Sequence, residues 1–160
     1  MGVNISPAQL HSDALDLDAW LARLTQLGLP GSCLVAEITE SVLLEADMDV
    51  AEKLARLRAA GLQMAIDDFG TGYSALSYLK HFPVEYLKID QTFVREIVTD
   101  ANDKAIVVTI IAIAGHLGLD VIAEGVETRE QLEALRECGC ERFQGYLFGR
   151  PDVAERLFSA

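Results

Sequence analysis

Two adjacent carboxylates, Asp67 and Asp68, follow an apolar segment, and a loop with two glycines, Gly70 and Gly72, comes directly after them. An unpaired carboxylate is costly to bury, so acids at the end of a buried strand need a partner. Divalent cations bind oxygen-rich sites of this kind, and one site can hold two of them. The alternative is that an Asp after a strand caps the next helix. Because similar polar endings recur along the chain, a shared binding site is favoured.

Polar residues of metal-binding or phosphate-binding type occur at or near the C-terminal end of every predicted strand. Taken singly, each could cap a helix, face solvent or bind a loop carbonyl. Those roles do not explain why such residues follow all the strands at the same end, so we expect them to converge. The residues are Asn4, Glu37, Asp67, Lys88, Glu124 and Gln144.

The elements that must position these residues alternate between strands and helices. Apolar runs and turn signals predict strands within 3–7 and over 33–38, 63–67, 86–90, 120–124 and 142–148. Helical spacing and capping residues predict helices that begin at Pro7, that end at Gly28 and at Gly61, and that cover 74–81, 104–117 and 128–139, with a final helical turn in 151–160.

This alternation predicts an α/β fold with a parallel sheet and helices on its face. A doubly wound sheet and a (β/α) TIM-type barrel both fit the pattern. A doubly wound fold gathers its site at one crevice, whereas a barrel gathers residues from every strand at one end. Polar residues after every predicted strand therefore favour the barrel.

Composition narrows the classes of partner. The chain has 160 residues, 51% of them hydrophobic, which suits a single globular domain over 1–160. Its formal net charge of −12 argues against DNA or RNA as a partner. An anionic substrate stays open, because a bound metal would invert the local field.

Cysteine usage and hydropathy bear on location. The three cysteines, Cys33, Cys138 and Cys140, form no convincing disulfide framework and suit reduced thiols. The longest apolar run, 105–115, is too short to span a bilayer. We therefore expect a cytoplasmic domain without direct membrane insertion, although a longer parent protein could be tethered to a membrane.

Six motifs, in order, resemble the successive signatures of the EAL-domain family, bacterial phosphodiesterases that open cyclic di-GMP to linear pGpG. The resemblance covers the chain from Val3 to about Pro151. The motifs are Val3-Asn4-Ile5-Ser6, Glu37-Ile38-Thr39-Glu40-Ser41, Ile66-Asp67-Asp68-Phe69-Gly70-Thr71-Gly72-Tyr73-Ser74, Leu87-Lys88-Ile89-Asp90, Ile122-Ala123-Glu124-Gly125-Val126-Glu127-Thr128 and Gln144-Gly145-Tyr146.

The resemblance implies two cations, Mg²⁺ or Mn²⁺, in the mouth of a barrel, and a role for each matching residue. Asn4, Glu37 and Asp67 would bind the first metal, and Asp67, Asp68 and Glu124 the second. Lys88 would hold and polarise the attacking water, Glu127 and Gln144 would support the second metal's water shell and the substrate phosphate, and Glu40 would anchor the loop from Asp68 to Ser74. Two metals would neutralise the phosphodiester and lower the pKa of a bridging water.

The chain departs from the family pattern at its start. The Glu-Ala-Leu motif, whose glutamate binds metal in the family, has no counterpart there, and Glu133-Ala134-Leu135 falls in a predicted helix. A full barrel has roughly 250 residues. We therefore expect a partial barrel of about six strands that lacks the first two βα units and is shielded as a homodimer. Alternatively, the chain is a fragment of a longer protein with regulatory domains, and Met1-Gly2 is a start-codon remnant.

Three functions stay open at this point. The leading hypothesis is metal-dependent hydrolysis of cyclic di-GMP to pGpG by a water activated by two metals. The second is a non-catalytic module that binds cyclic di-GMP or a protein partner. The third is a Schiff-base enzyme using Lys88, which nearby carboxylates oppose because they would raise the pKa of this lysine.

Overall fold

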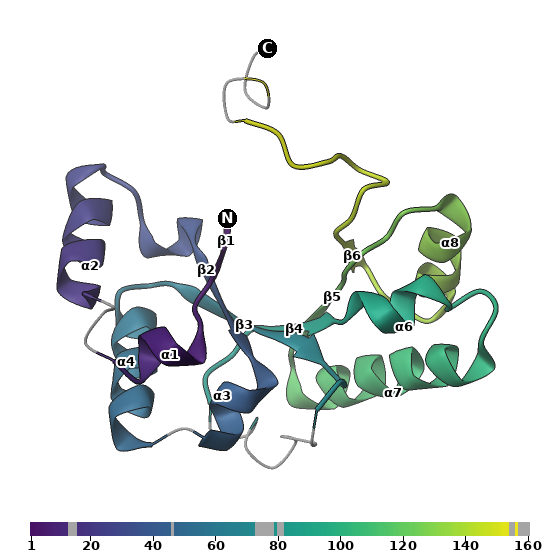
Figure 1. Cartoon of the computed structure of the whole chain (residues 1–160), viewed down its shortest axis with the longest axis horizontal. Coiled ribbons are helices and arrows are strands. Elements are labelled where there is room, and N and C mark those ends of the chain that lie inside the picture. The colour runs from purple at the N-terminus through teal and green to yellow at the C-terminus, as the bar shows by residue number, and fades with distance from the viewer. Residues whose placement is uncertain (13–15, 46, 73–78, 80–81, 154–155, 157–160) are drawn as a thin grey trace.

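The computed structural model describes residues 1–12, 16–45, 47–72, 79, 82–153 and 156. Six parallel strands form one curved sheet, and their order in the sheet is their order in the sequence. This half-barrel confirms the predicted barrel-type architecture (Figure 1). The strands are β1 (Gly2–Asn4), β2 (Val35–Thr39), β3 (Gln63–Phe69), β4 (Tyr86–Ile89), β5 (Asp120–Ala123) and β6 (Arg142–Phe143).

Helices connect the strands and lie around the outside of the sheet, from α2 at one end to α8 at the other (Figure 1). Among the described residues, no helix combines the length and the apolar character that crossing a bilayer requires. The helices are α1 (Pro7–Leu10), α2 (Leu17–Gln26), a 3₁₀ turn η1 (Gly31–Cys33), α3 (Glu40–Glu45), α4 (Met48–Ala59), α6 (Gln91–Arg95), α7 (Ala101–Leu117) and α8 (Arg129–Glu137).

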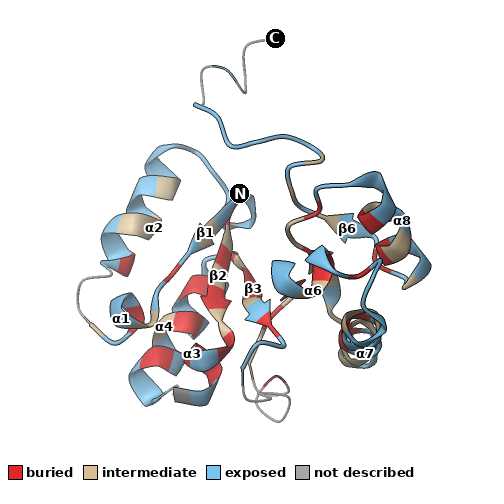
Figure 2. Cartoon of the chain, turned by 45° about the vertical axis from the view of Figure 1, so that its right-hand side comes forward, coloured by how far each residue is buried: buried red, intermediate tan, exposed pale blue. Residues whose placement is uncertain are grey.

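The hydrophobic core lies between the sheet and these helices. Side chains alternate between the two faces of a strand, and in β2 the core residues are Ala36 and Ile38. They belong to the same core cluster as buried residues of α4 such as Leu54. Figure 2 shows the buried parts of β2 and α4 in red. Glu37, between them, therefore points to the opposite, inner face of the sheet. Lys88 in β4 has the same relation to its buried neighbours, Leu87 and Ile89.

Helix starts follow the predicted caps. Ser6 and Gln9 form a capping box at α1, and Thr128 and Gln131 form one at α8. In each case the hydroxyl accepts from a backbone N–H of the first turn while the amide side chain accepts from the cap residue's N–H. Gly118, with φ 71°, ends α7 as predicted.

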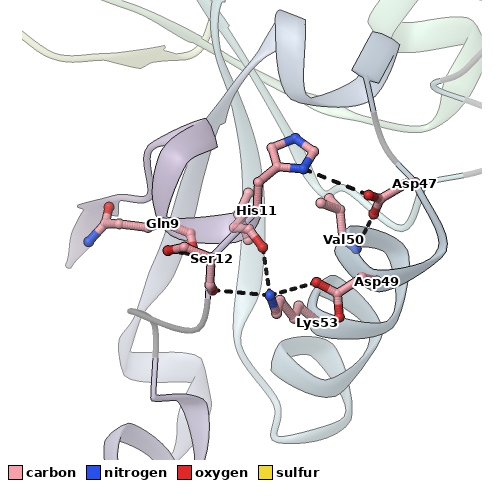
Figure 3. Close-up of polar contacts among 8 residues, drawn as sticks. Gln9, His11, Ser12, Asp47, Asp49, Val50 and Lys53 are labelled. Atoms are coloured by element: carbon pink, nitrogen blue, oxygen red, sulfur yellow. Dashed lines mark hydrogen bonds and ion pairs between the residues drawn. The ribbon is translucent and has the colours of Figure 1, made fainter.

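Lys53 of α4 holds the C-terminal end of α1 through hydrogen bonds to its backbone. Lys53 Nζ donates to the carbonyl oxygens of Leu10 and Ser12, at 2.7 and 3.2 Å, and pairs with Asp49 Oδ2 at 2.7 Å (Figure 3). The side chain of Lys53 is only 13% exposed. These carbonyls lie at the C-terminal end of α1, where helices leave acceptors unpaired, so Lys53 satisfies them from a distant element.

Several boundaries differ from the predictions. Residues 142–148 were predicted as one strand, but β6 ends at Phe143, because Leu147 N donates to Val126 O and Phe148 N to Gly145 O, so the chain turns. The strand predicted over 33–38 begins at Val35, since Cys33 belongs to η1. The short helices α3 and α6 were not predicted. Apart from Leu79, the helix predicted over 74–81 lies outside the described residues, as does most of the turn predicted in 151–160.

Candidate active site

The two adjacent aspartates lie inside β3 rather than at its end, because the strand continues to Phe69. The pairing of β3 with β4 shifts between Ile66 and Phe69, which makes a bulge at Asp67 and Asp68. Asp68 has φ 54°, a left-handed conformation that Asp tolerates better than most residues. In a regular strand consecutive side chains point to opposite faces, so the bulge re-aims Asp68.

Because of this bulge, carboxylate oxygens of Asp67, Asp68 and Glu124 all lie within 4.8 Å of one another. The third residue, Glu124, follows β5, and its backbone N–H donates to Ile89 O at 3.1 Å. Three acids from two segments about 60 residues apart thus meet near the C-terminal ends of β3 and β5. The N-cap alternative for the two aspartates does not hold, since both lie within the strand.

Lys88 joins this group to Glu37. Its Nζ lies 2.6 Å from Glu37 Oε2, 3.0 Å from Asp67 Oδ1 and 2.6 Å from Glu124 Oε1. The lysine side chain is 3% exposed, and the three carboxylates are 14% to 17% exposed. One ammonium therefore faces three acids from β2, β3 and the end of β5, and the group keeps an excess of negative charge.

This arrangement raises the pKa values of both the lysine, Lys88, and one of its acidic partners, Glu124. Burial opposes the charged form of Lys88, but hydrogen bonds to Glu124, Glu37 and Asp67 outweigh it and raise its pKa above the usual value. Burial also raises the pKa of Glu124, and repulsion from Asp67 and Glu37 adds to it, although Lys88 acts in the opposite direction. Lys88 is thus a protonated hydrogen-bond donor at neutral pH, which rules against the Schiff-base alternative.

A further acid, Asp90, was part of a quoted motif but was not predicted as a site residue. Asp90 caps α6, accepting from Thr92 N at 2.8 Å, and is 8% exposed. Burial opposes its ionisation, yet hydrogen bonds from Thr92 and Asp68 lower the pKa of Asp90. Burial and the neighbouring Asp90 and Asp67 raise the pKa of Asp68. The sequence signal that could have identified Asp90 is its position directly after β4. Asp90 also has the helix-capping role that was the alternative for Asp67.

A hollow of about 220 Å³ opens beside Glu124. Glu127 and Gln144, both exposed, line this hollow. Gln144 is held by backbone bonds on both sides, from its N to Ala123 O and from Val126 N to its O. Gln91 and Tyr146 also line this hollow and were not assigned to the site from the sequence. Tyr146 belongs to the motif Gln144-Gly145-Tyr146, and Gln91 directly follows the last residue of the motif Leu87-Lys88-Ile89-Asp90.

Asn4 and Glu40 lie at the margins of the acid group. Asn4 pairs in register with Glu37, so both side chains point to the same face, and Asn4 is exposed. Glu40 starts α3 and is 5% exposed. A Cβ built on Gly72 would lie 3.3 Å from Glu40 Oε2, so this carboxylate lies directly against the loop that follows β3.

The donor set suits a hard divalent cation. Asp67, Asp68 and Glu124 supply carboxylate oxygens close enough together to share an ion, and Glu37 and Asn4 add oxygen donors on the same face of the sheet. Carboxylate and amide oxygens favour Mg²⁺, Mn²⁺ or Ca²⁺ over softer metals. The residues present therefore fit the metal that the sequence motifs imply.

Comparison with known proteins agrees with the geometry. The model of the EAL domain matches residues 1–151. The cyclic di-GMP phosphodiesterase RocR of Pseudomonas aeruginosa is 43% identical over 151 residues, which are 94% of this chain and 38% of RocR. The bifunctional diguanylate cyclase/cyclic di-GMP phosphodiesterase MucR of the same species is 43% identical over 161 residues, covering 100% of this chain and 23% of MucR. The chain thus spans well under half the length of these relatives.

Solved structures give the same answer for the fold. The PaMucR phosphodiesterase in complex with c-di-GMP superimposes with a TM-score of 0.90 at 43% identity, over 98% of this chain and 63% of that one. Klebsiella pneumoniae BlrP1 with manganese and cyclic di-GMP gives 0.84 at 36% identity, over 94% and 38%. BlrP1 with calcium and cyclic di-GMP gives 0.83 at 38% identity, over 94% and 38%. Motifs, half-barrel and acid group agree with these matches, and the chain belongs to the EAL domain family.

Proposed function

We propose that this chain carries most of the active site of a metal-dependent phosphodiesterase that opens cyclic di-GMP to linear pGpG. The observation that supports it best is the convergence of Asp67, Asp68 and Glu124 within 4.8 Å beside the Lys88 ammonium. Carboxylate groups of this kind bind hard cations, and two relatives named as cyclic di-GMP phosphodiesterases are 43% identical to the chain. A phosphodiester is an anion, so it can bind at this acidic site only when bound cations offset the negative charge of the carboxylates.

Mg²⁺ or Mn²⁺ bound here would neutralise the phosphodiester and lower the pKa of a bound water. We assign Asn4, Glu37 and Asp67 to one ion, and Asp67, Asp68 and Glu124 to the other.

Lys88 would act as a donor in this reaction. Its raised pKa keeps the ammonium protonated, so it orients a water or a phosphate oxygen and does not remove a proton. Three short contacts fix its Nζ on the inner face of the sheet, which limits the positions a bound oxygen can take. Glu127 and Gln144, at the rim of the hollow, would hold the water shell of the second ion and the substrate phosphate.

Glu40 would connect ion binding to the loop after β3. Its carboxylate lies against Gly72, four residues beyond Asp68. A movement of Asp68 on ion binding would therefore displace Gly72 and change its contact with Glu40.

The homodimer expected from the sequence remains part of this proposal. Large apolar side chains are exposed on and before α7, including Val98, Ile106 and Val108. Exposed apolar patches often mark contacts between proteins. The mass of one chain is 17.5 kDa, and light scattering after size exclusion should give twice that value. Val108→Glu should disrupt the dimer, so that this variant has the mass of a single chain.

Product analysis tests the activity directly. The chain is incubated with cyclic di-GMP and Mn²⁺, and linear pGpG is measured by mass spectrometry. Asp67→Ala should abolish product, whereas Asp120→Asn, which removes an exposed acid from the opposite end of the sheet, should leave it unchanged. Tight binding of cyclic di-GMP without product would favour a non-catalytic binding module, and neither binding nor product would refute the proposal.

A further inference from the structure

The segment 124–128, which follows β5 and carries two acids assigned to the site, is held by two kinds of partner. The backbone N–H of Val126 donates to a main-chain carbonyl oxygen at 3.0 Å. The backbone N–H groups of Glu127 and Thr128 donate instead to a side-chain oxygen, Gln131 Oε1, at 2.8 and 3.0 Å. The position of Glu127 therefore depends on a side chain from α8.

Gln131 does more than cap its own helix. In a capping box, the side chain at the third helical position accepts from the N–H of the cap residue, which is Thr128 here. Gln131 Oε1 also accepts from Glu127 N, and its Nε2 donates to Arg95 O, at the last residue of α6, at 3.3 Å. Gln131 is 8% exposed, so leaving its bonding partners unpaired in this place would be costly.

The helix that receives the bond from Gln131 is itself positioned next to the acid group. Asp90, beside Asp68, caps the start of α6. A Cβ built on Gly125 would lie 2.5 Å from the Cβ of Gln91, the first residue of α6. The helices α6 and α8 lie next to each other (Figure 1). The segment after β5 is thus tied to α6 at both ends of this short helix.

We propose that Gln131 is a positioning residue, which fixes Glu127 relative to the acid group by tying the segment 124–128 to α6. This inference rests on the proposed function, because that function assigns Glu127 to the water shell of the second ion and to the substrate phosphate. Glu127 is exposed, so its place at the site is set through its backbone. A displacement of about 1 Å in a group that positions a substrate can reduce the rate about 100-fold.

Steady-state kinetics of pGpG formation from cyclic di-GMP with Mn²⁺ test the inference. Gln131→Leu has a side chain of similar size without hydrogen-bonding groups, and its kcat/KM should fall about 10- to 100-fold. Gln131→Glu keeps an acceptor oxygen for Glu127 N and loses the donor to Arg95 O. This variant should retain more activity than Gln131→Leu, because Glu also completes a capping box.

Thr128→Ala is the matched control for the stability of α8. It removes the hydroxyl that accepts from Gln131 N and leaves the bond from Glu127 N to Gln131 Oε1 in place. The thermal midpoint should fall, as expected when a helix loses its cap, while kcat/KM stays within about twofold of the unmodified chain.

A double-mutant cycle with Glu127→Gln separates positioning from general support of the fold. If Gln131 acts through the Glu127 carboxylate, Gln131→Leu should have little further effect once that carboxylate is absent. Amide hydrogen exchange, measured by NMR, should be faster at Glu127 and Thr128 in Gln131→Leu than in the unmodified chain.

Several results would overturn the inference while leaving the proposed function intact. These are unchanged activity or unchanged exchange in Gln131→Leu, an equal loss of activity in Thr128→Ala, and the same fold-loss from Gln131→Leu with and without the Glu127 carboxylate. If the unmodified chain forms no pGpG, the proposed function fails, and the inference that depends on it fails as well.

Discussion

Asp67 and Asp68 are consecutive residues of β3, yet a carboxylate oxygen of each lies within 4.8 Å of the other and of Glu124. The bulge opposite β4 makes this possible by turning Asp68 into a left-handed conformation. The negative charges of these three carboxylates are therefore close enough to repel one another. Strain and repulsion of this kind are common where a protein binds a cation or a substrate.

Asp68→Asn should stabilise the metal-free chain and weaken metal binding. Burial and the acids Asp90 and Asp67 raise the pKa of Asp68, so its charged form is disfavoured in the folded state. The free energy of unfolding should accordingly fall as the pH rises from 3.8, the usual pKa of an aspartate, through the raised pKa of Asp68. The amide of Asp68→Asn does not titrate, so this variant should not show that fall. Urea unfolding in EDTA between pH 3.5 and 7, followed by a Mn²⁺ titration, measures both effects. A variant less stable than the unmodified chain at pH 7 would contradict the repulsion.

Lys88→Met should destabilise the chain without metal by about 3–5 kcal/mol, because partly buried carboxylates would lose their counter-charge. Added Mn²⁺ should restore more stability to this variant than to the unmodified chain, since the ion replaces the missing positive charge. Thermal unfolding with EDTA and with Mn²⁺ gives both numbers. Arg142→Met removes an exposed cation paired with Asp120 and should change stability by only about 0–1 kcal/mol.

Gly72→Ala and Glu40→Ala should be energetically coupled. The new methyl group of Gly72→Ala would lie 3.3 Å from Glu40 Oε2, a contact that forces one of the two groups to move. Gly72→Ala should therefore destabilise the unmodified chain more than it destabilises the Glu40→Ala variant. A double-mutant cycle should give a coupling energy of about 0.5–3 kcal/mol. Additive effects would show that the loop does not rest on Glu40.

Lys53→Met should cost about 1–3 kcal/mol of folding stability, because two backbone carbonyls of the α1 end would lose a charged donor in a nearly buried position. Lys104→Met is the comparison, since its pair with Glu137 is exposed and should contribute about 0–1 kcal/mol. Denaturant unfolding of both variants measures the difference. Equal costs would mean that the contacts in Figure 3 contribute no more than a surface ion pair.

Local signals in the sequence predicted most elements correctly. Ser6 and Thr128 marked helix starts, Gly118 marked a helix end, and the alternation of strands and helices predicted a parallel sheet of barrel type. The predictions failed where distant partners decide the outcome. β6 ends at Phe143 because Val126, from another segment, bonds to the turn that follows, and no local pattern contains that contact.

The sequence by itself determined which side chains are available, since capping, periodicity and the polar ends of strands depend on neighbours within a few residues. It could not determine their mutual placement. Lys88 and Glu37 are 51 positions apart, and only the register of the parallel strands places Nζ 2.6 Å from that carboxylate. The bulge at Asp67 and Asp68 likewise exists only because β3 pairs with β4. Tertiary structure alone decided that the acids meet, because register and bulges are set by contacts between separate strands.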